Sequence, residues 1–160
     1  MKSKIFLLLT IFLLSGCSSN NKDSATNSIP TPSSEVSQSV QDAYDLLVNT
    51  ETFASAAVGF AGSVSEQVKA FRAILDSDNS EQLFTNLQTE AKLAGQLYGV
   101  CGLYLTNKEK FNEVIPAYQN NRNKVTTFFG CIMDETEVAL LVTSFEDGSL
   151  PLSFQNCVIE

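Results

Sequence analysis

The stretch AGQLYGVCGLYL, residues 94–105, carries the clearest structural pattern in the chain. Ala94, Leu97, Tyr98, Cys101 and Leu105 fall at positions i, i+3, i+4, i+7 and i+11, which places them on one face of an α-helix. The stripe predicts a helix with one buried face, around which other elements pack. The chain has 160 residues, of which 44% are apolar, and this is enough for one globular domain but not for two.

Further helices are predicted on both sides of this segment. Ser34 or Ser37 caps the first, Ser63–Glu66 fits a capping box for the second, and Thr106–Glu109 fits one for the helix after residues 94–105. We expect that last helix to bend or end near Pro116, and residues 76–80 to form a polar break. The apolar stripes of these helices are Val36, Val40, Ala43, Tyr44 and Leu47; Val64, Val68, Phe71, Ile74 and Leu75; Leu83, Phe84, Leu87 and Ala91; and Phe111, Val114, Ile115 and Tyr118.

Strand signals are concentrated near the C-terminus. Residues 124–133, KVTTFFGCIM, are β-branched and aromatic and predict one strand, and apolar residues alternate over 150–158 as in a last strand. The small apolar run 53–62, FASAAVGFAG, favours a strand over a helix. Asp134 with Glu137 predicts the start of one more helix, closed by Gly148. We therefore expect an α+β fold in which about five or six helices pack on a small, mainly antiparallel sheet.

The composition excludes several functions. The formal charge of −8 argues against nucleic-acid binding, because a phosphate backbone requires a basic surface. The chain has no His, which removes the commonest general base and the commonest metal ligand. No phosphate-binding loop, nucleophile elbow or zinc motif is present in the sequence, so we predict no cofactor and no metal site.

The first seventeen residues have the order of an export signal. Lys2 and Lys4 precede the apolar run 5–14, which is too short to span a bilayer, and Leu14-Ser15-Gly16-Cys17 follows. This segment resembles the signal peptide and lipobox of bacterial lipoproteins. The resemblance implies cleavage after Gly16 and attachment of a diacylglyceryl group to the thiol of Cys17. An ordinary secretory signal is the alternative.

The resemblance divides the chain into a signal peptide (1–16), a lipid-anchored Cys17 with a Ser/Asn/Thr/Pro-rich linker (17–34) and one globular domain (35–160). The composition of the linker cannot bury a core and predicts a disordered spacer. Without residues 1–16 the chain carries 8 basic and 18 acidic side chains, a charge of −10. Anionic head groups repel such a domain, so the lipid would be what holds it at the membrane. In lipoproteins of Gram-negative bacteria an Asp after the lipid-bearing Cys tends to retain the protein in the inner membrane. With Ser18 at that position, the resemblance implies the periplasmic face of the outer membrane, if the source is Gram-negative.

Three cysteines remain after Cys17, and an oxidising compartment favours one disulfide. Cys101 lies on the helical stripe, and Cys131 shares a predicted strand face with Val125 and Phe129. Cys157 shares the polar face of the last predicted strand. We therefore expect a Cys101–Cys131 disulfide with Cys157 as the odd thiol; three buried thiols are the alternative.

Acidic residues provide the other candidate sites. Glu109 with Glu113, or Asp134 with Glu135 or Glu137, could form a carboxylate pair for glycan or peptidoglycan hydrolysis, although caps and a solvated surface explain these residues better. Asp76, Asp78 and Ser80 only partly match a calcium loop, because Glu81 stands where such a loop needs Gly and Leu87 stands where it needs a bidentate Glu.

The favoured function is a non-enzymatic binding module whose partner is another envelope protein with a basic surface. The alternative is a carboxylate-dependent envelope hydrolase.

Overall fold

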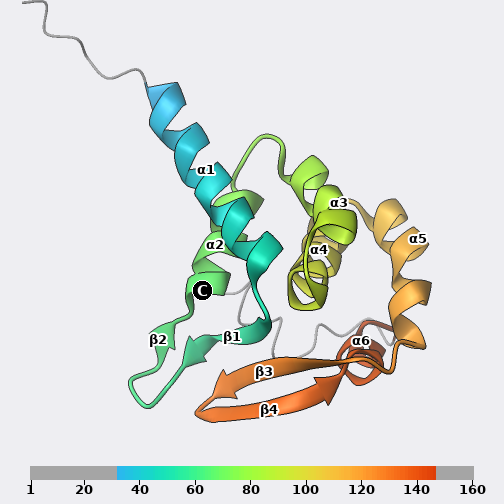
Figure 1. Cartoon of the computed structure of the whole chain (residues 1–160). Coiled ribbons are helices and arrows are strands. Elements are labelled where there is room, and N and C mark those ends of the chain that lie inside the picture. The colour runs from blue at the N-terminus through green and yellow to red at the C-terminus, as the bar shows by residue number, and fades with distance from the viewer. Residues whose placement is uncertain (1–31, 147–160) are drawn as a thin grey trace, which may run out of the picture. The chain divides into compact units, whose positions relative to one another are not determined.

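Six helices and four strands make up residues 32–146, the part of the chain that the computed structural model describes (Figure 1). The predicted α+β class is confirmed. In chain order the elements are α1 (Pro32–Asn49), β1 (Thr52–Val58), β2 (Ser63–Val64), α2 (Glu66–Leu75), α3 (Ser80–Glu90), α4 (Leu93–Thr106), α5 (Lys108–Gln119), β3 (Lys124–Gly130), β4 (Ile132–Glu137) and α6 (Val138–Glu146).

The four strands form one mixed sheet in the order β2-β1-β3-β4. β1 pairs antiparallel with β2, β3 pairs antiparallel with β4, and the two hairpins meet through a parallel pairing of β1 with β3. Two of the three pairings are antiparallel, as expected for a mainly antiparallel sheet. The segment between β1 and β3 contains β2 and α2 to α5, so most of the helices belong to one long crossover connection.

α4, the helix of the opening stretch, lies at the centre of the core. Leu97, Tyr98 and Cys101 are fully buried, and α4 contacts α1, α3, α5, β1 and β3. Figure 1 shows α1 to α4 on one side of the sheet. The stripe that marked this helix in the sequence therefore faces the core, and the rest of the helix is mostly buried as well.

Three glycines let neighbouring helices approach α4 closely. A Cβ atom at Gly102 would overlap the ring of Phe84 on α3, and one at Gly95 would overlap the carbonyl oxygen of Leu47 on α1. Gly99 faces the carbonyl oxygen of Phe84 in the same way. The packing distance between α4 and its partners thus depends on the absence of side chains at these positions.

The predicted single strand over residues 124–133 is wrong, because the chain turns back within it. β3 ends at Gly130, whose φ of 57° lies in the left-handed region, and β4 begins at Ile132. Asp134 to Glu137 then lie in β4, opposite Thr127 to Lys124, instead of capping a helix. The helix predicted there begins at Val138, whose N–H donates to the Asn123 carbonyl at 3.0 Å.

Two predicted helix caps lie at neighbouring positions. α2 is capped by Ser65, whose Oγ accepts a hydrogen bond from the N–H of Val68, while Ser63 belongs to β2. α5 is capped by Asn107 rather than Thr106, with the Asn107 side chain accepting from the N–H of Lys110. α5 also continues through Pro116 to Gln119, so the helix does not end at the proline.

Several predictions fall outside the described residues. They are the signal peptide, Cys17 and the linker up to residue 31, and, at the C-terminal end, Gly148, the strand over 150–158 and Cys157. α1 begins at Pro32, three residues before the predicted domain boundary. None of the helices within 32–146 is both long and apolar enough to cross a membrane.

Candidate functional site

The turns of the two β-hairpins lie side by side at one end of the sheet (Figure 1). The N–H of Gly59 donates to the carbonyl of Gly130 at 2.8 Å, which joins the two turns directly. The N–H of Gly130 in turn donates to Ser55 Oγ at 3.2 Å. Gly59 and Gly62 have φ values of 71° and 62°, so the first turn uses backbone conformations that favour glycine.

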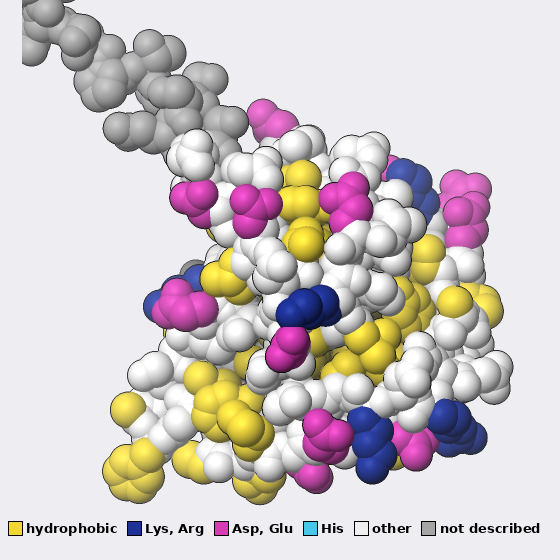
Figure 2. All heavy atoms as spheres, viewed as in Figure 1, with side chains coloured by type: hydrophobic (Ala, Val, Ile, Leu, Met, Phe, Trp, Pro, Cys, Tyr) yellow, Lys and Arg dark blue, Asp and Glu magenta, His cyan; other side chains and the backbone are white. Residues whose placement is uncertain are grey.

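Large apolar side chains project from this end of the sheet into solvent. Phe60 is completely exposed, Ile132 is 71% exposed and Met133 is 64% exposed, and Val64 in β2 is partly exposed as well. Figure 2 shows hydrophobic side chains gathered at its lower left, over these turns. We call residues 59–64 together with 130–133 the hairpin end.

The hairpin end also lacks charge. No charged side chain occurs between Glu51 and Glu66 or between Lys124 and Asp134. The remainder of the described domain is strongly acidic, with 15 Asp and Glu against 7 Lys and Arg in residues 32–146. A neutral apolar end on an acidic domain is the composition of a contact surface rather than of an ordinary solvated surface.

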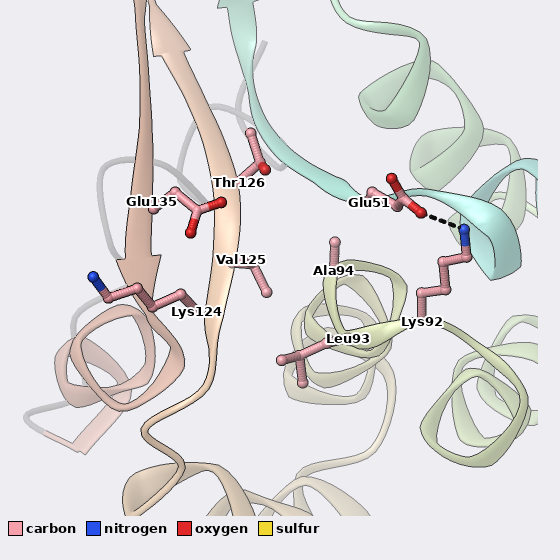
Figure 3. Close-up of a pocket in the computed structure, with 8 residues that line it drawn as sticks. All are labelled: Glu51, Lys92, Leu93, Ala94, Lys124, Val125, Thr126 and Glu135. Carbon is pink, nitrogen blue, oxygen red and sulfur yellow. Dashed lines mark hydrogen bonds and ion pairs between the residues drawn. The ribbon is translucent and has the colours of Figure 1, made fainter.

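An open hollow of about 240 Å³ lies at the start of α4, next to β3 and β4 (Figure 3). Lys92 Nζ and Glu51 Oε1 form an ion pair of 2.6 Å at its edge, and the hydrogen bond from Lys92 holds the pKa of Glu51 below its usual value. Lys124 and Glu135 lie on the sheet side. The other lining residues are Leu93, Ala94, Val125 and Thr126.

This hollow offers charged groups of both signs but no assembled catalytic machinery. Its lining contains two carboxylates, two ammonium groups and the hydroxyl of Thr126, and an ion pair joins Glu51 to Lys92. A nucleophile held by a base, which is in turn held by a third group, is not present among these residues. The arrangement can hold a small polar group by charge.

The candidate catalytic carboxylates are spread over the surface. Glu109 and Glu113 are exposed on α5, whereas Asp134, Glu135 and Glu137 lie on β4. Of these five residues, Glu135 alone lines the hollow.

The strand geometry separates the residues on β4. Asp134 and Glu135 are adjacent strand residues, so their side chains point to opposite faces of the sheet and cannot act as a pair. Glu137 is held by Arg122 at 3.0 Å. Asp134 and Glu137 lie three residues apart on the same strand, so they also point to opposite faces, and neither predicted pairing of Asp134 is formed.

The remaining candidate site from the sequence is the partial calcium motif of Asp76, Asp78 and Ser80. Asp76 ends α2 and Ser80 begins α3, so the partial calcium motif forms the connection between two helices. In residues 32–146, no three His, Cys, Asp or Glu side chains come together as a metal site.

The predicted Cys101–Cys131 disulfide is not formed. Cys101 is buried in α4, while Cys131 is exposed in the β3–β4 turn. The prediction requires Cys131 to lie in a strand whose face turns toward the core, but the chain reverses at Gly130 and carries the thiol to the surface. Cys17 and Cys157 lie outside the described residues.

Sequence reasoning missed the hairpin end because its turns are apolar. Phe60 lies inside the predicted strand over 53–62, and Ile132 and Met133 end the predicted strand over 124–133, because both segments are largely apolar and hide the turns within them. The available signal was the glycines: Gly59 and Gly62 flank Phe60, and Gly130 interrupts the aromatic run. In comparisons with known proteins, no family model, curated protein or solved structure matches the chain.

Proposed function

We propose that this protein is a lipid-anchored module of the bacterial cell envelope that binds another envelope protein and has no catalytic activity of its own. The anchor is proposed from the lipobox-like residues Leu14 to Cys17. Two or more acyl chains hold a protein at a membrane essentially permanently. The proposed location is the periplasmic face of the outer membrane.

The binding role rests on the distribution of charge over the described domain. α1 and α3 contain no Lys or Arg, and they contact each other. Asp42, Asp45 and Glu90 are exposed on these two helices, and Figure 2 shows acidic side chains over α1. We call these three residues the acidic face. A basic surface on the partner would complement it and speed the encounter.

Hydrogen bonds hold the acidic face in place. Gln38 Nε2 donates to Asp42 and Gln41 Nε2 donates to Asp45, both at 2.9 Å. Tyr44 donates its hydroxyl to Glu90 at 2.8 Å, which connects α1 to α3. The carboxylates are therefore positioned while they remain open to solvent, which suits recognition of cationic groups.

The hydrolase alternative finds no comparable support among the described residues. Its five candidate carboxylates lie on two elements, and one of them lines the hollow. A retaining or inverting glycosidase needs two carboxylates that face the same bond.

Two experiments test the proposal. Cys17→Ser should abolish incorporation of labelled palmitate and release the protein from membranes; continued labelling would show that the anchor is elsewhere. For binding, Asp42→Lys/Asp45→Lys should lose a partner that is cross-linked to the protein in intact envelopes.

The matched control for the binding experiment is Glu109→Lys/Glu113→Lys, which makes the same change of charge on the exposed surface of α5. It should retain the partner. Equal loss from both variants would contradict a role for the acidic face, because it would mean that net charge alone matters.

A further inference from the structure

The hairpin end is built to present Phe60 away from the domain. The residue lies between two glycines with positive φ, and its side chain contributes nothing to the core because it is completely exposed. Ile132 and Met133 begin β4 directly after the neighbouring turn, which is fixed to the first by the Gly59–Gly130 hydrogen bond, and as adjacent strand residues they project from opposite faces of the sheet. Three large apolar side chains are thus exposed at the same end of the sheet, on both of its faces, at considerable cost in exposed apolar surface.

The chemistry of this end favours lipid over protein as its occupant. A protein partner, including a second copy of this chain, must offer an apolar pocket that receives a projecting Phe. The hollow described for this chain has four charged lining residues and does not fit that role. A bilayer accepts projecting apolar side chains without a preformed pocket, provided that no charge enters with them. The hairpin end meets that condition, since residues 52–65 and 125–133 carry no charge.

The charges that are nearest along the chain limit how deep such an insertion can be. Asp134 follows Met133 directly, and Glu66 follows the short strand β2. Both are exposed acids that must remain in water, so only the two turns and the first two residues of β4 can enter the bilayer, with the end of the sheet pointing into it. The same acids disfavour an anionic surface, and the fitting surface is one of zwitterionic lipid.

The chain before α1 is long enough to allow this contact. From Cys17 to Thr31 there are 15 residues, which span at most about 50 Å when extended. α1 has 18 residues and is about 27 Å long. Figure 1 shows the start of α1 far from the two turns. A domain anchored through Cys17 can therefore lie along the bilayer and bring its hairpin end to the surface.

We propose that Phe60, Ile132 and Met133 insert together, at shallow depth, into the zwitterionic bilayer that holds the lipid anchor. This inference rests on the proposed anchor at Cys17. It gives the domain a second membrane contact, which fixes the orientation of the domain relative to the bilayer. The acidic face then has one fixed orientation relative to the bilayer as well.

The absence of Trp from the chain makes the contact directly measurable. Phe60→Trp places a sole indole fluorophore at the hairpin end, and Leu140→Trp is the matched control. Leu140 is also exposed, at 63%, but lies on α6, which follows the opposite end of the β3–β4 hairpin. The full-chain variants, exported and purified in detergent, are incorporated into phosphatidylcholine vesicles with or without acyl-chain bromine, and flotation is recorded with fluorescence.

We expect both variants to float with the vesicles. Indole emission from the Phe60→Trp variant should shift to shorter wavelength and lose most of its intensity in brominated lipid, while emission from the Leu140→Trp variant should stay unquenched. Adding Ile132→Ser/Met133→Ser to Phe60→Trp, or adding phosphatidylglycerol to the vesicles, should weaken the quenching.

Each contrary outcome has a distinct meaning. Flotation without quenching of Phe60→Trp overturns the insertion and leaves the anchor intact. Absence of flotation overturns the anchor and, with it, this inference. A spectral shift that appears without lipid and grows with protein concentration identifies a second copy as the occupant and also overturns the inference.

Discussion

The hydroxyl of Tyr98 makes two hydrogen bonds to the backbone of Ala54: it donates to the carbonyl at 3.1 Å and accepts from the N–H at 2.9 Å. Tyr98 lies on α4 and Ala54 on β1, so a single side chain ties the central helix to the sheet. The bond falls where the pairing of β1 with β3 changes register, between Ala54 and Val58. It satisfies buried backbone groups at the irregular part of the ladder.

Tyr98→Phe should therefore destabilise the domain by about 2–3 kcal/mol, because it leaves a buried N–H and a buried C=O without their partner. Urea unfolding followed by circular dichroism measures the change. Tyr118→Phe is the matched control: the Tyr118 hydroxyl bonds to the side chains of Gln88 and Gln96, which can turn toward other partners. We expect that variant to lose about 1 kcal/mol. An equal loss from both would contradict the role given to Tyr98.

Gly102→Ala should destabilise the protein although Ala is the better helix former. At an unconstrained helical position this substitution gains about 1 kcal/mol. Here the added methyl group would overlap the ring of Phe84, and overpacking of a core costs about 1–3 kcal/mol. Thermal unfolding should give a lower midpoint than the wild type. Phe84→Leu combined with Gly102→Ala should recover part of the loss, and strict additivity of the two changes would argue against a direct clash.

The helices of this fold can be predicted from the sequence because the apolar pattern of a helix involves only residues that are close together in the chain. The sequence pattern places Val68, Phe71 and Ile74 on one face of a helix, and all three are fully buried in α2. Each stripe repeats within a few residues, so its period identifies the helix without knowledge of its partners. The cap positions are less certain because two candidate cap residues stand close together, as Ser63 and Ser65 do.

The sheet is harder to predict from the sequence because each strand pairs with residues that can be distant in the chain. β4 contains Asp134 to Glu137, a charged run that matches a helix start, and it becomes a strand because it pairs with β3. The turn before it lies at Gly130 and Cys131, and β4 begins directly with the apolar pair Ile132 and Met133, so the polar residues that usually mark a turn are missing. An apolar turn exposed to solvent is a local conflict with folding rules, and such conflicts are typical of functional surfaces.

Stability should fall between pH 10 and about pH 12, in part through Tyr118. Burial raises the pKa of Tyr118 from 10.0 to about 12, so the folded state keeps this proton where the unfolded chain has lost it. Because the unfolded state binds fewer protons in this window, the free energy of unfolding decreases as pH rises. Tyr118→Phe should make that decrease less steep. Parallel curves for the variant and the wild type would contradict the assignment.

The two described cysteines should differ strongly in reactivity. Cys131 is exposed in its turn, whereas Cys101 is buried in α4. Maleimide applied to the folded full chain should modify Cys131 rapidly, and modification of Cys101 should require denaturant. Peptide mapping after a short exposure distinguishes the two sites. Recovery of a Cys101–Cys131 cross-linked peptide from unreduced protein would contradict the structure at the β3–β4 turn.

Phe60 should contribute almost nothing to folding, in contrast to Phe53 seven residues earlier. Phe53 is fully buried and its ring centroid lies 4.8 Å from that of Tyr98, so Phe53→Leu should cost about 1–3 kcal/mol through lost packing. Phe60→Ser removes a side chain without core contacts and should change the free energy of unfolding by less than about 0.5 kcal/mol. Urea titration of both variants makes the comparison. A large loss from Phe60→Ser would mean that Phe60 is needed for folding. A folding role would then explain this residue, and its exposure would no longer support contact of the hairpin end with a membrane.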